Sequence, residues 1–173
     1  GIGGGGSNAV NYMFENGIKG VDFVICNTDL QALEASLVPI KIQLGVNLTE
    51  GLGAGANPEV GKRAAEESTD RIIELLDANT KMLFVTAGMG GGTGTGAAPV
   101  IAEIAQEKGI LTIGVVTIPF STEGGYRRKY ADEGIIELKK YVDTLLVIDN
   151  EKLIEVYGDL TFTNAFAKAN EVL

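Results

Sequence analysis

The strongest constraint on the fold is a glycine-rich segment that lies between a strand-like run and a helix-like run. Six of the nine residues from Gly88 to Gly96 are glycine. The apolar run Met82–Ala87 precedes them, and the helical pattern Ala97–Lys108, ended by Gly109, follows. Glycines in this number cost conformational entropy on folding, so the segment is favoured where main-chain N–H groups must approach a ligand. It therefore predicts a phosphate-binding loop at a helix N-terminus.

The same alternation of strand-like and helix-like segments extends along the whole chain. Strands are expected at Val21–Asn27, Lys41–Leu44, Met82–Ala87, Leu111–Ile118 and Thr144–Asp149. Helices are expected at Asn8–Asn16, Pro58–Asp77, Ala97–Lys108, Tyr126–Lys140 and Thr163–Leu173. Strands that alternate with helices predict a three-layer α/β fold, in which a mostly parallel sheet carries helices on both faces.

The 173 residues predict a single domain, residues 1–173, that is truncated at both ends. A glycine-rich turn of this kind normally follows a strand, yet Gly1 is the first residue, so we expect a strand before it. The helix that opens near Thr163 has no stop signal before Leu173, so we expect it to continue.

Composition excludes several classes of function. The net charge of −9 argues against nucleic-acid binding, which needs clustered Lys and Arg. Histidine is absent, which removes Ser-His-Asp catalysis and His-based zinc sites. The single cysteine, Cys26, cannot form an internal disulfide and fits a reducing cytoplasm. The apolar runs are too short for direct membrane insertion. Any chemistry here must use carboxylates, amides, Arg or a bound metal.

The N-terminal segment Gly1–Asn8 carries a second glycine motif, with the spacing G-x-G-x-x-G at Gly1, Gly3 and Gly6. Glycines at a strand-to-helix turn let N–H groups approach a phosphate, and the helix dipole favours the negative charge. Dinucleotide-binding folds have the same spacing, and Asp29 would then hold the ribose. A flexible glycine linker also has this composition.

Two glycine loops, each followed by a helix, favour a phosphate chain that is held from both sides. Neither loop is a Walker A motif. An NAD(P)-dependent oxidoreductase domain remains the alternative, because the first loop and Asp29 would suffice for it, although it leaves Gly88–Gly96 without a role. A scaffold without enzymatic activity is a third hypothesis, and the intact glycine loops argue against it.

Several motifs together resemble one family. The segment Thr86–Gly96, in which GGGTGTG follows TAGM, resembles the signature of the tubulin/FtsZ family of GTPases. Further segments resemble other loops of the family and the start of its central helix: Asn27–Asp29, Gly51–Pro58, Val116–Phe120, Glu123 with Arg127, and Asn164–Leu173. The run GLGAGANPEVG resembles the bacterial division branch more than eukaryotic tubulin.

The resemblance implies a binding site for GTP or GDP, with Mg²⁺ accompanying the nucleotide. The residues expected at the phosphates are Gly4, Gly5, Gly6, Ser7, Ala54, Gly55, Ala56, Gly90, Gly91, Gly92, Thr93 and Gly94. Those expected around the sugar and base are Asn8, Glu123, Arg127, Phe166 and Asn170, and the remaining expected nucleotide-binding residues are Asp29, Thr117 and Pro119. Among them, Ala54–Ala56 would sense the γ-phosphate, Phe166 would stack on guanine and Asn170 would hydrogen-bond to its edge.

Plainer interpretations of the single residues stay open. Glu123 and Arg127 are four apart and could form a surface pair on a helix. Phe166 could belong to the core, and Asn170 could be solvated. For the second loop, we expect Gly92→Val to abolish nucleotide binding in a folded protein, because a β-branched side chain would keep the main chain away from the phosphates.

The resemblance also implies the role of the whole protein. Members of the family are filament-forming GTPases, and the bacterial branch assembles the cytokinetic ring at the division site in the cytoplasm. Self-association is head to tail, and division regulators and membrane adaptors are the further expected partners. Hydrolysis requires an acidic loop of the adjacent protomer, which lies beyond the central helix with the C-terminal domain. We therefore expect no catalytic residue in this chain, and slow hydrolysis by it alone.

Overall fold

The computed structural model describes residues 1–77, 79–158 and 161–173, with the backbone alone for Phe162. The elements follow one another as α1 (Gly3–Glu15), β1 (Val24–Asn27), α2 (Leu30–Ala35), β2 (Ile40–Gln43), α3 (Val46–Thr49), α4 (Pro58–Glu67), α5 (Thr69–Leu76), β3 (Met82–Gly88), α6 (Thr93–Glu107), β4 (Leu111–Ile118), the 3₁₀ turn η1 (Ser121–Glu123), α7 (Gly125–Lys139), β5 (Thr144–Asp149), α8 (Asn150–Tyr157) and α9 (Phe162–Val172). Across these described ranges, no helix is long and apolar enough to cross a membrane.

All strand pairs in the sheet are parallel. β1 pairs with β2, and β4 lies between β3 and β5. Ile2 bridges Cys26 of β1 and Ala87 of β3, so it joins the two groups in the order β2-β1-Ile2-β3-β4-β5. Its N–H donates to the Thr86 carbonyl at 2.9 Å. The strand predicted ahead of Gly1 and the truncated single domain stay predictions.

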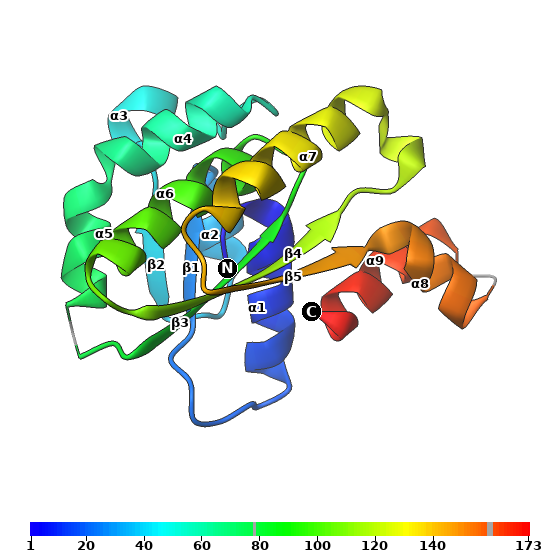
Figure 1. Cartoon of the computed structure of the whole chain (residues 1–173), viewed down its shortest axis with the longest axis horizontal. Helices are drawn as coiled ribbons and strands as arrows, with labels where there is room; N and C mark the ends of the chain where they lie inside the picture. Colours follow the sequence, from blue (N-terminus) through cyan, green and yellow to red (C-terminus); the bar gives the residue numbers. More distant parts are fainter. Residues whose placement is uncertain (78, 159–160) are drawn as a thin grey trace.

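Helices cover both faces of this sheet, and β1 shows why. Its side chains alternate, as strand geometry requires. Ile25 packs with Val10 of α1 and Leu33 of α2, whereas Cys26 joins the larger core between the sheet and α4–α7. Figure 1 shows α4–α7 along one side of the strands and α1 with α9 on the other. The predicted three-layer α/β fold is therefore confirmed.

The bounds of the elements differ from the predictions in informative places. β4 and β5 have their predicted limits. α1 and α6 begin five and four residues earlier than predicted, at Gly3 and Thr93, so parts of both glycine loops are helical. The short helices α2, α3 and α8 were not predicted. Two of these short helices have local start signals, because the Asp29 and Asp149 side chains cap α2 and α8.

The predicted helix Pro58–Asp77 is wrong as a single helix, since α4 and α5 divide at Ser68. The Ser68 hydroxyl accepts a hydrogen bond from Gly45 N at 3.0 Å. The neighbouring Glu67 carboxylate accepts from the N–H groups of Asn47 and Leu48 at 2.9 and 3.0 Å. The break therefore anchors the segment that leads from β2 into α3.

Candidate functional site

A cavity of about 600 Å³ lies at the carboxyl ends of the strands, where parallel α/β folds usually bind ligands. Most of the predicted site residues line it: Gly4, Gly5, Asn8, Asp29, Ala54, Ala56, Gly91, Gly92, Thr93, Gly94, Thr117, Pro119, Glu123, Arg127, Phe166 and Asn170. Four predicted residues do not: Gly6, Ser7, Gly55 and Gly90. Residues from segments far apart in the sequence thus meet in one place.

The first glycine loop is the opening turn of α1. The N–H groups of Gly3, Gly4 and Gly5 belong to that turn and have no acceptor within the helix, so they can serve a ligand. Gly6 packs on β3 instead, because a Cβ there would lie 2.2 Å from the Thr86 carbonyl oxygen. Ser7 is 4% exposed. Gly6 thus seats α1 against β3, while the Ser7 hydroxyl is buried without a hydrogen-bond partner among the described residues. The phosphate role expected of both residues stays a prediction.

The second glycine loop runs into α6, which begins at Thr93. The N–H groups of Thr93 and Gly94 lie in the first helical turn and lack helical acceptors. The Gly90 N–H donates to the Thr95 hydroxyl at 2.8 Å, so it is used within the loop and Gly90 lies outside the lining. The ligand-facing part of this loop is therefore Gly91–Gly94.

The two helix N-termini meet at the cavity. A Cβ on Gly3 would lie 2.8 Å from Gly94 N, and one on Gly5 would lie 3.0 Å from the Gly88 Cα. The positive ends of two helix dipoles therefore converge on one place, which favours an anion. The Arg127 guanidinium is close by, because a Cβ on Gly91 would be 4.0 Å from its Nη1.

The segment after β1 joins this region to the loop between α3 and α4. The hydroxyls of Thr28 and Thr93 are 2.6 Å apart and buried. The Thr28 carbonyl accepts from Gly53 N at 3.3 Å. In the α3–α4 loop, Ala56 has a φ of 58°, which is strained for a residue with a Cβ. Gly55 is exposed and lies outside the lining.

Side chains rather than main chain form the other end of the cavity. Phe166 and Asn170 come from α9 and Asn8 from α1. The Phe166 ring meets Phe120 edge to face, with ring centres 5.1 Å apart. Asn150, at the start of α8, also lines the cavity, is 4% exposed, and its Oδ1 is buried without a hydrogen-bond partner among the described residues.

Asn150 and Thr28 are lining residues that the sequence reasoning missed. Each follows the carboxyl end of a predicted strand, which is the signal that could have identified both. Thr28 lies inside the Asn27–Asp29 motif, where Asp29 alone was selected. A polar residue directly after a buried parallel strand is thus worth including in a candidate site.

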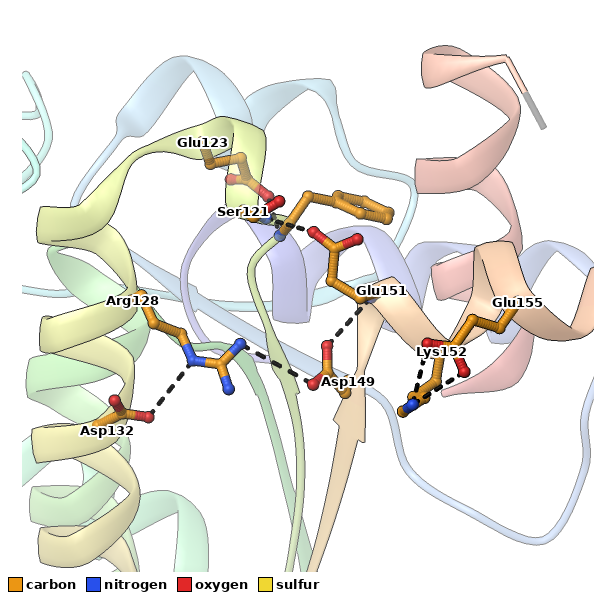
Figure 2. Close-up of polar contacts among 9 residues, drawn as sticks. Ser121, Glu123, Arg128, Asp132, Asp149, Glu151, Lys152 and Glu155 are labelled. Atoms are coloured by element: carbon orange, nitrogen blue, oxygen red, sulfur yellow. Dashed lines mark hydrogen bonds and ion pairs between the residues drawn. The ribbon is translucent and has the colours of Figure 1, made fainter. Parts of the chain in front are cut away.

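The connection between β4 and α7 forms the wall beside Arg127. Glu123 Oε1 accepts from Phe120 N at 2.9 Å, and the Ser121 N–H donates to Glu151 of α8 (Figure 2). This backbone hydrogen bond holds the pKa of Glu151 below its usual value. The plainer interpretation of Glu123 and Arg127 was an ion pair on the surface. Within the described residues this pair does not form, and the neighbouring Arg128 pairs with Asp132.

Comparison with known proteins identifies the family to which this chain belongs. A family model described as the GTPase domain of the Tubulin/FtsZ family matches residues 1–158. The chain belongs to the tubulin/FtsZ family. The resemblance inferred from the glycine loops is therefore confirmed, and the loops of this tubulin/FtsZ GTPase domain are those that line the cavity.

Individual relatives are close in sequence and in structure. The cell division protein FtsZ of Rhizobium radiobacter is 61% identical over 174 positions, which cover 100% of this chain and 30% of that protein. FtsZ of Rickettsia conorii is 59% identical, with 38% of its length covered. The chain thus spans about a third of the length of these relatives. An empty FtsZ dimer from M. jannaschii superposes with a TM-score of 0.96 at 47% identity, over 99% of this chain and 50% of that one.

The oxidoreductase alternative finds no support in these matches. It rested on the first glycine loop and on Asp29 as a ribose partner. In the structure the Asp29 carboxylate accepts from Ala32 N at 3.1 Å and caps α2. The tubulin/FtsZ family also accounts for Gly88–Gly96, which the alternative left without a role.

The lining offers few ligands of its own to a metal ion. The described residues contain no group of three or more His, Cys, Asp or Glu side chains placed to hold one. The two carboxylates that line the cavity, Asp29 and Glu123, each already accept a main-chain N–H. Mg²⁺ prefers oxygen donors and usually takes several from phosphates and water.

Proposed function

We propose that this domain binds GTP and GDP, with the phosphates where α1 and α6 begin. The observation that carries the proposal is the close approach of the two helix N-termini, which places Gly3 against Gly94. The N–H groups of Gly4, Gly5 and Gly91–Gly94 then face a phosphate chain from two sides. Ala54 lies beside Gly92, and Ala54 and Ala56 both line the cavity, so they would respond to the terminal phosphate.

The base and sugar would occupy the end of the cavity that is built from side chains. Phe166 provides a ring face for stacking, while Asn170, Asn150 and Asn8 provide amides for the edge of guanine. The buried Oδ1 of Asn150 supports this placement, because a ligand N–H would satisfy it. Glu123, Arg127, Asp29, Thr117 and Pro119 line the same cavity, and Glu123 and Arg127 would lie beside the sugar.

Mg²⁺ would arrive with the nucleotide and neutralise charge on the phosphates. Its charged ligands would be phosphate oxygens, because the part of the chain that the structure describes has no group of three or more His, Cys, Asp or Glu side chains placed to hold a metal. The Thr28 and Thr93 hydroxyls, which both line the cavity, are the side chains that fit its preference for oxygen.

In the complete protein, the domain would act in a filament-forming cell-division GTPase. The relatives named cell division protein FtsZ support this role, and the M. jannaschii match is itself a dimer. We propose head-to-tail self-association at the division site in the cytoplasm, with regulators and membrane adaptors as further partners. The acidic loop of the next protomer would complete hydrolysis, so this chain alone should turn over GTP slowly.

Calorimetric titration of the purified domain with GTP, GDP, ATP and NADH tests the proposal. We expect GTP and GDP to bind with similar affinity, ATP more weakly and NADH not at all. A thermal melt provides a second readout, since a ligand that binds only the native state raises the melting temperature. Equal binding of ATP and GTP, or binding of NADH alone, would overturn the proposal.

A further inference from the structure

Two walls of the cavity, distant in sequence, are linked beyond the point where β4 and β5 pair at Ile118 and Asp149. Pro119 and Glu123, on the connection between β4 and α7, form one wall. Asn150, at the start of α8, belongs to the other. The link between them is a hydrogen bond in which the Ser121 N–H donates to the Glu151 carboxylate, across 30 positions of sequence.

The surroundings of Glu151 hold the start of α8 in position. Its own N–H donates to Asp149 Oδ1 at 3.0 Å, which caps α8. The other oxygen of Asp149 lies 3.8 Å from Nη1 of Arg128, on α7. Figure 2 shows the resulting chain of contacts, which runs from α7 through the end of β5 to the β4–α7 connection. The walls are thus tied both at the connection and at the helix that follows it.

Glu151 does not itself line the cavity. Two residues next to this hydrogen bond line the cavity. Asn150 directly precedes Glu151, and Glu123 lies on the same 3₁₀ turn as Ser121. The hydrogen bond favours the ionised carboxylate, which lowers the pKa of Glu151. The charged Glu151 carboxylate therefore accepts a hydrogen bond from the Ser121 N–H on the opposite wall.

We propose that Glu151 is a positioning residue for the sugar-and-base end of the nucleotide site, because it sets the separation between the wall that carries Glu123 and the wall that carries Asn150. The inference rests on the proposed binding of guanine nucleotides. Loss of the tie widens the sugar-and-base end and leaves the two glycine loops unchanged. The affinities for GTP and GDP therefore fall by the same factor, and the affinity for inorganic pyrophosphate, which has no sugar or base, stays constant.

The first test is calorimetric titration of Glu151→Ala with GTP, GDP and pyrophosphate. We expect GTP and GDP to bind about fivefold more weakly, as for the loss of one charge-assisted hydrogen bond. Glu151→Gln keeps a carbonyl acceptor and should restore most of the affinity. Glu155→Ala is the matched control, because Glu155 lies on the same helix and pairs with Lys152 rather than with the other wall.

Ser121→Pro removes the donor from the other side of the same bond. Phe120 has φ −61° and ψ 147°, the conformation that a residue before proline prefers, and Ser121 is the first residue of η1, where proline is tolerated. Ser121→Pro should therefore weaken GTP and GDP binding as Glu151→Ala does. In the double variant the two losses should not add, because both remove one interaction.

The outcomes separate this inference from the proposed function. Wild-type protein that binds no guanine nucleotide would overturn the proposed function. Wild-type binding together with unchanged affinity in Glu151→Ala would overturn only the positioning role. Additive losses in the double variant, or an equal loss of pyrophosphate binding, would also overturn it. A drop in the melting temperature of Glu151→Ala without a change in nucleotide affinity would assign Glu151 to folding alone.

Discussion

The two ends of the cavity are built by opposite means. The glycine end is formed by main chain, where Gly3 meets Gly94 at a distance that leaves no room for a Cβ and Gly5 lies tightly against Gly88. The end near α9 is formed by side chains from α1, α8 and α9, and Phe166 is 37% exposed there. The first end owes its shape to the packing of helices on the sheet, and the second owes its chemistry to the identity of a few residues.

This difference predicts how substitutions behave at the two ends. At the glycine end the smallest added group either collides with the fold or enters the space for the ligand. At the α9 end a substitution can change preference among ligands without disturbing the fold. Measuring both the stability and the ligand preference of each variant therefore tests whether the two ends of the cavity differ in this way.

The largest effect is expected for Gly6→Ala. Its Cβ would lie 2.2 Å from the Thr86 carbonyl oxygen, so α1 must move off β3, and we expect a loss of about 3 kcal/mol in the free energy of unfolding. Gly4→Ala is the control on the same helix, because nothing lies within 4 Å of its Cβ. It should leave stability unchanged or raise it by up to about 1 kcal/mol. Urea unfolding measures both, and equal stabilities would contradict the packing role of Gly6.

Valine at Gly4 or Gly91 should abolish most nucleotide binding while the protein stays folded. Both residues line the cavity, and added atoms there meet open space in the protein, so the bulk falls where phosphates would lie. We expect affinities for GTP, GDP and ATP to drop about a hundredfold, as several N–H contacts are lost together. Gly125→Val is the control outside the cavity, because nothing lies within 4 Å of a Cβ on this exposed glycine and its φ is not positive. Native-like unfolding with unchanged GTP affinity at both sites would place the phosphates elsewhere.

Asn170→Leu should weaken GTP more than ATP. Guanine presents adjacent N–H donors that an Asn carbonyl can accept, and adenine does not, so we expect GTP affinity to fall about tenfold and the GTP/ATP preference to shrink. Asn170→Asp should be mild, because a carboxylate also accepts from both donors. Asn164→Leu, the same change at an exposed position of α9 outside the lining, is the matched control. Competition binding on the four proteins decides: an unchanged preference in Asn170→Leu would show that this side chain does not read the base.

The smallest effect is expected for Phe166→Leu. Stacking does not distinguish purines, so GTP and ATP should both weaken, by about fivefold, with their ratio constant. The same competition assay measures this. A change in the ratio would mean that Phe166 contributes to base choice through its contact with Phe120.

The sequence predicted the order of layers, the limits of β4 and β5 and most of the lining, because buried runs and glycine loops are local patterns. The predictions from sequence were wrong where a contact with a residue distant in sequence determines the local structure. Ser68 breaks a continuous helical pattern because Gly45 and the start of α3 need its hydroxyl and the Glu67 carboxylate. Gly6 looks equivalent to Gly4 in sequence, and only the register of α1 on β3 separates them.

Gly92 shows the same limit for a predicted mutant. The sequence suggested that Gly92→Val would leave the fold intact and block phosphates. In the structure a Cβ on Gly92 would lie 2.8 Å from both Asn57 N and the Ala54 Cβ, so the variant would displace the α3–α4 loop first. Gly91, one residue earlier, is the position that tests the phosphate contact without this clash.

The contact between Gly3 and Gly94 also limits how such a site can diverge. Every amino-acid replacement of a glycine adds at least one carbon, so point mutation has no neutral step to explore at that contact. A lineage could alter the glycine end only by shifting two helices together, which takes coordinated changes in the sheet beneath them. At the α9 end a single codon can exchange an amide for a carboxylate. New nucleotide preferences should therefore arise from substitutions in α8 and α9, while the residues of the phosphate end stay unchanged.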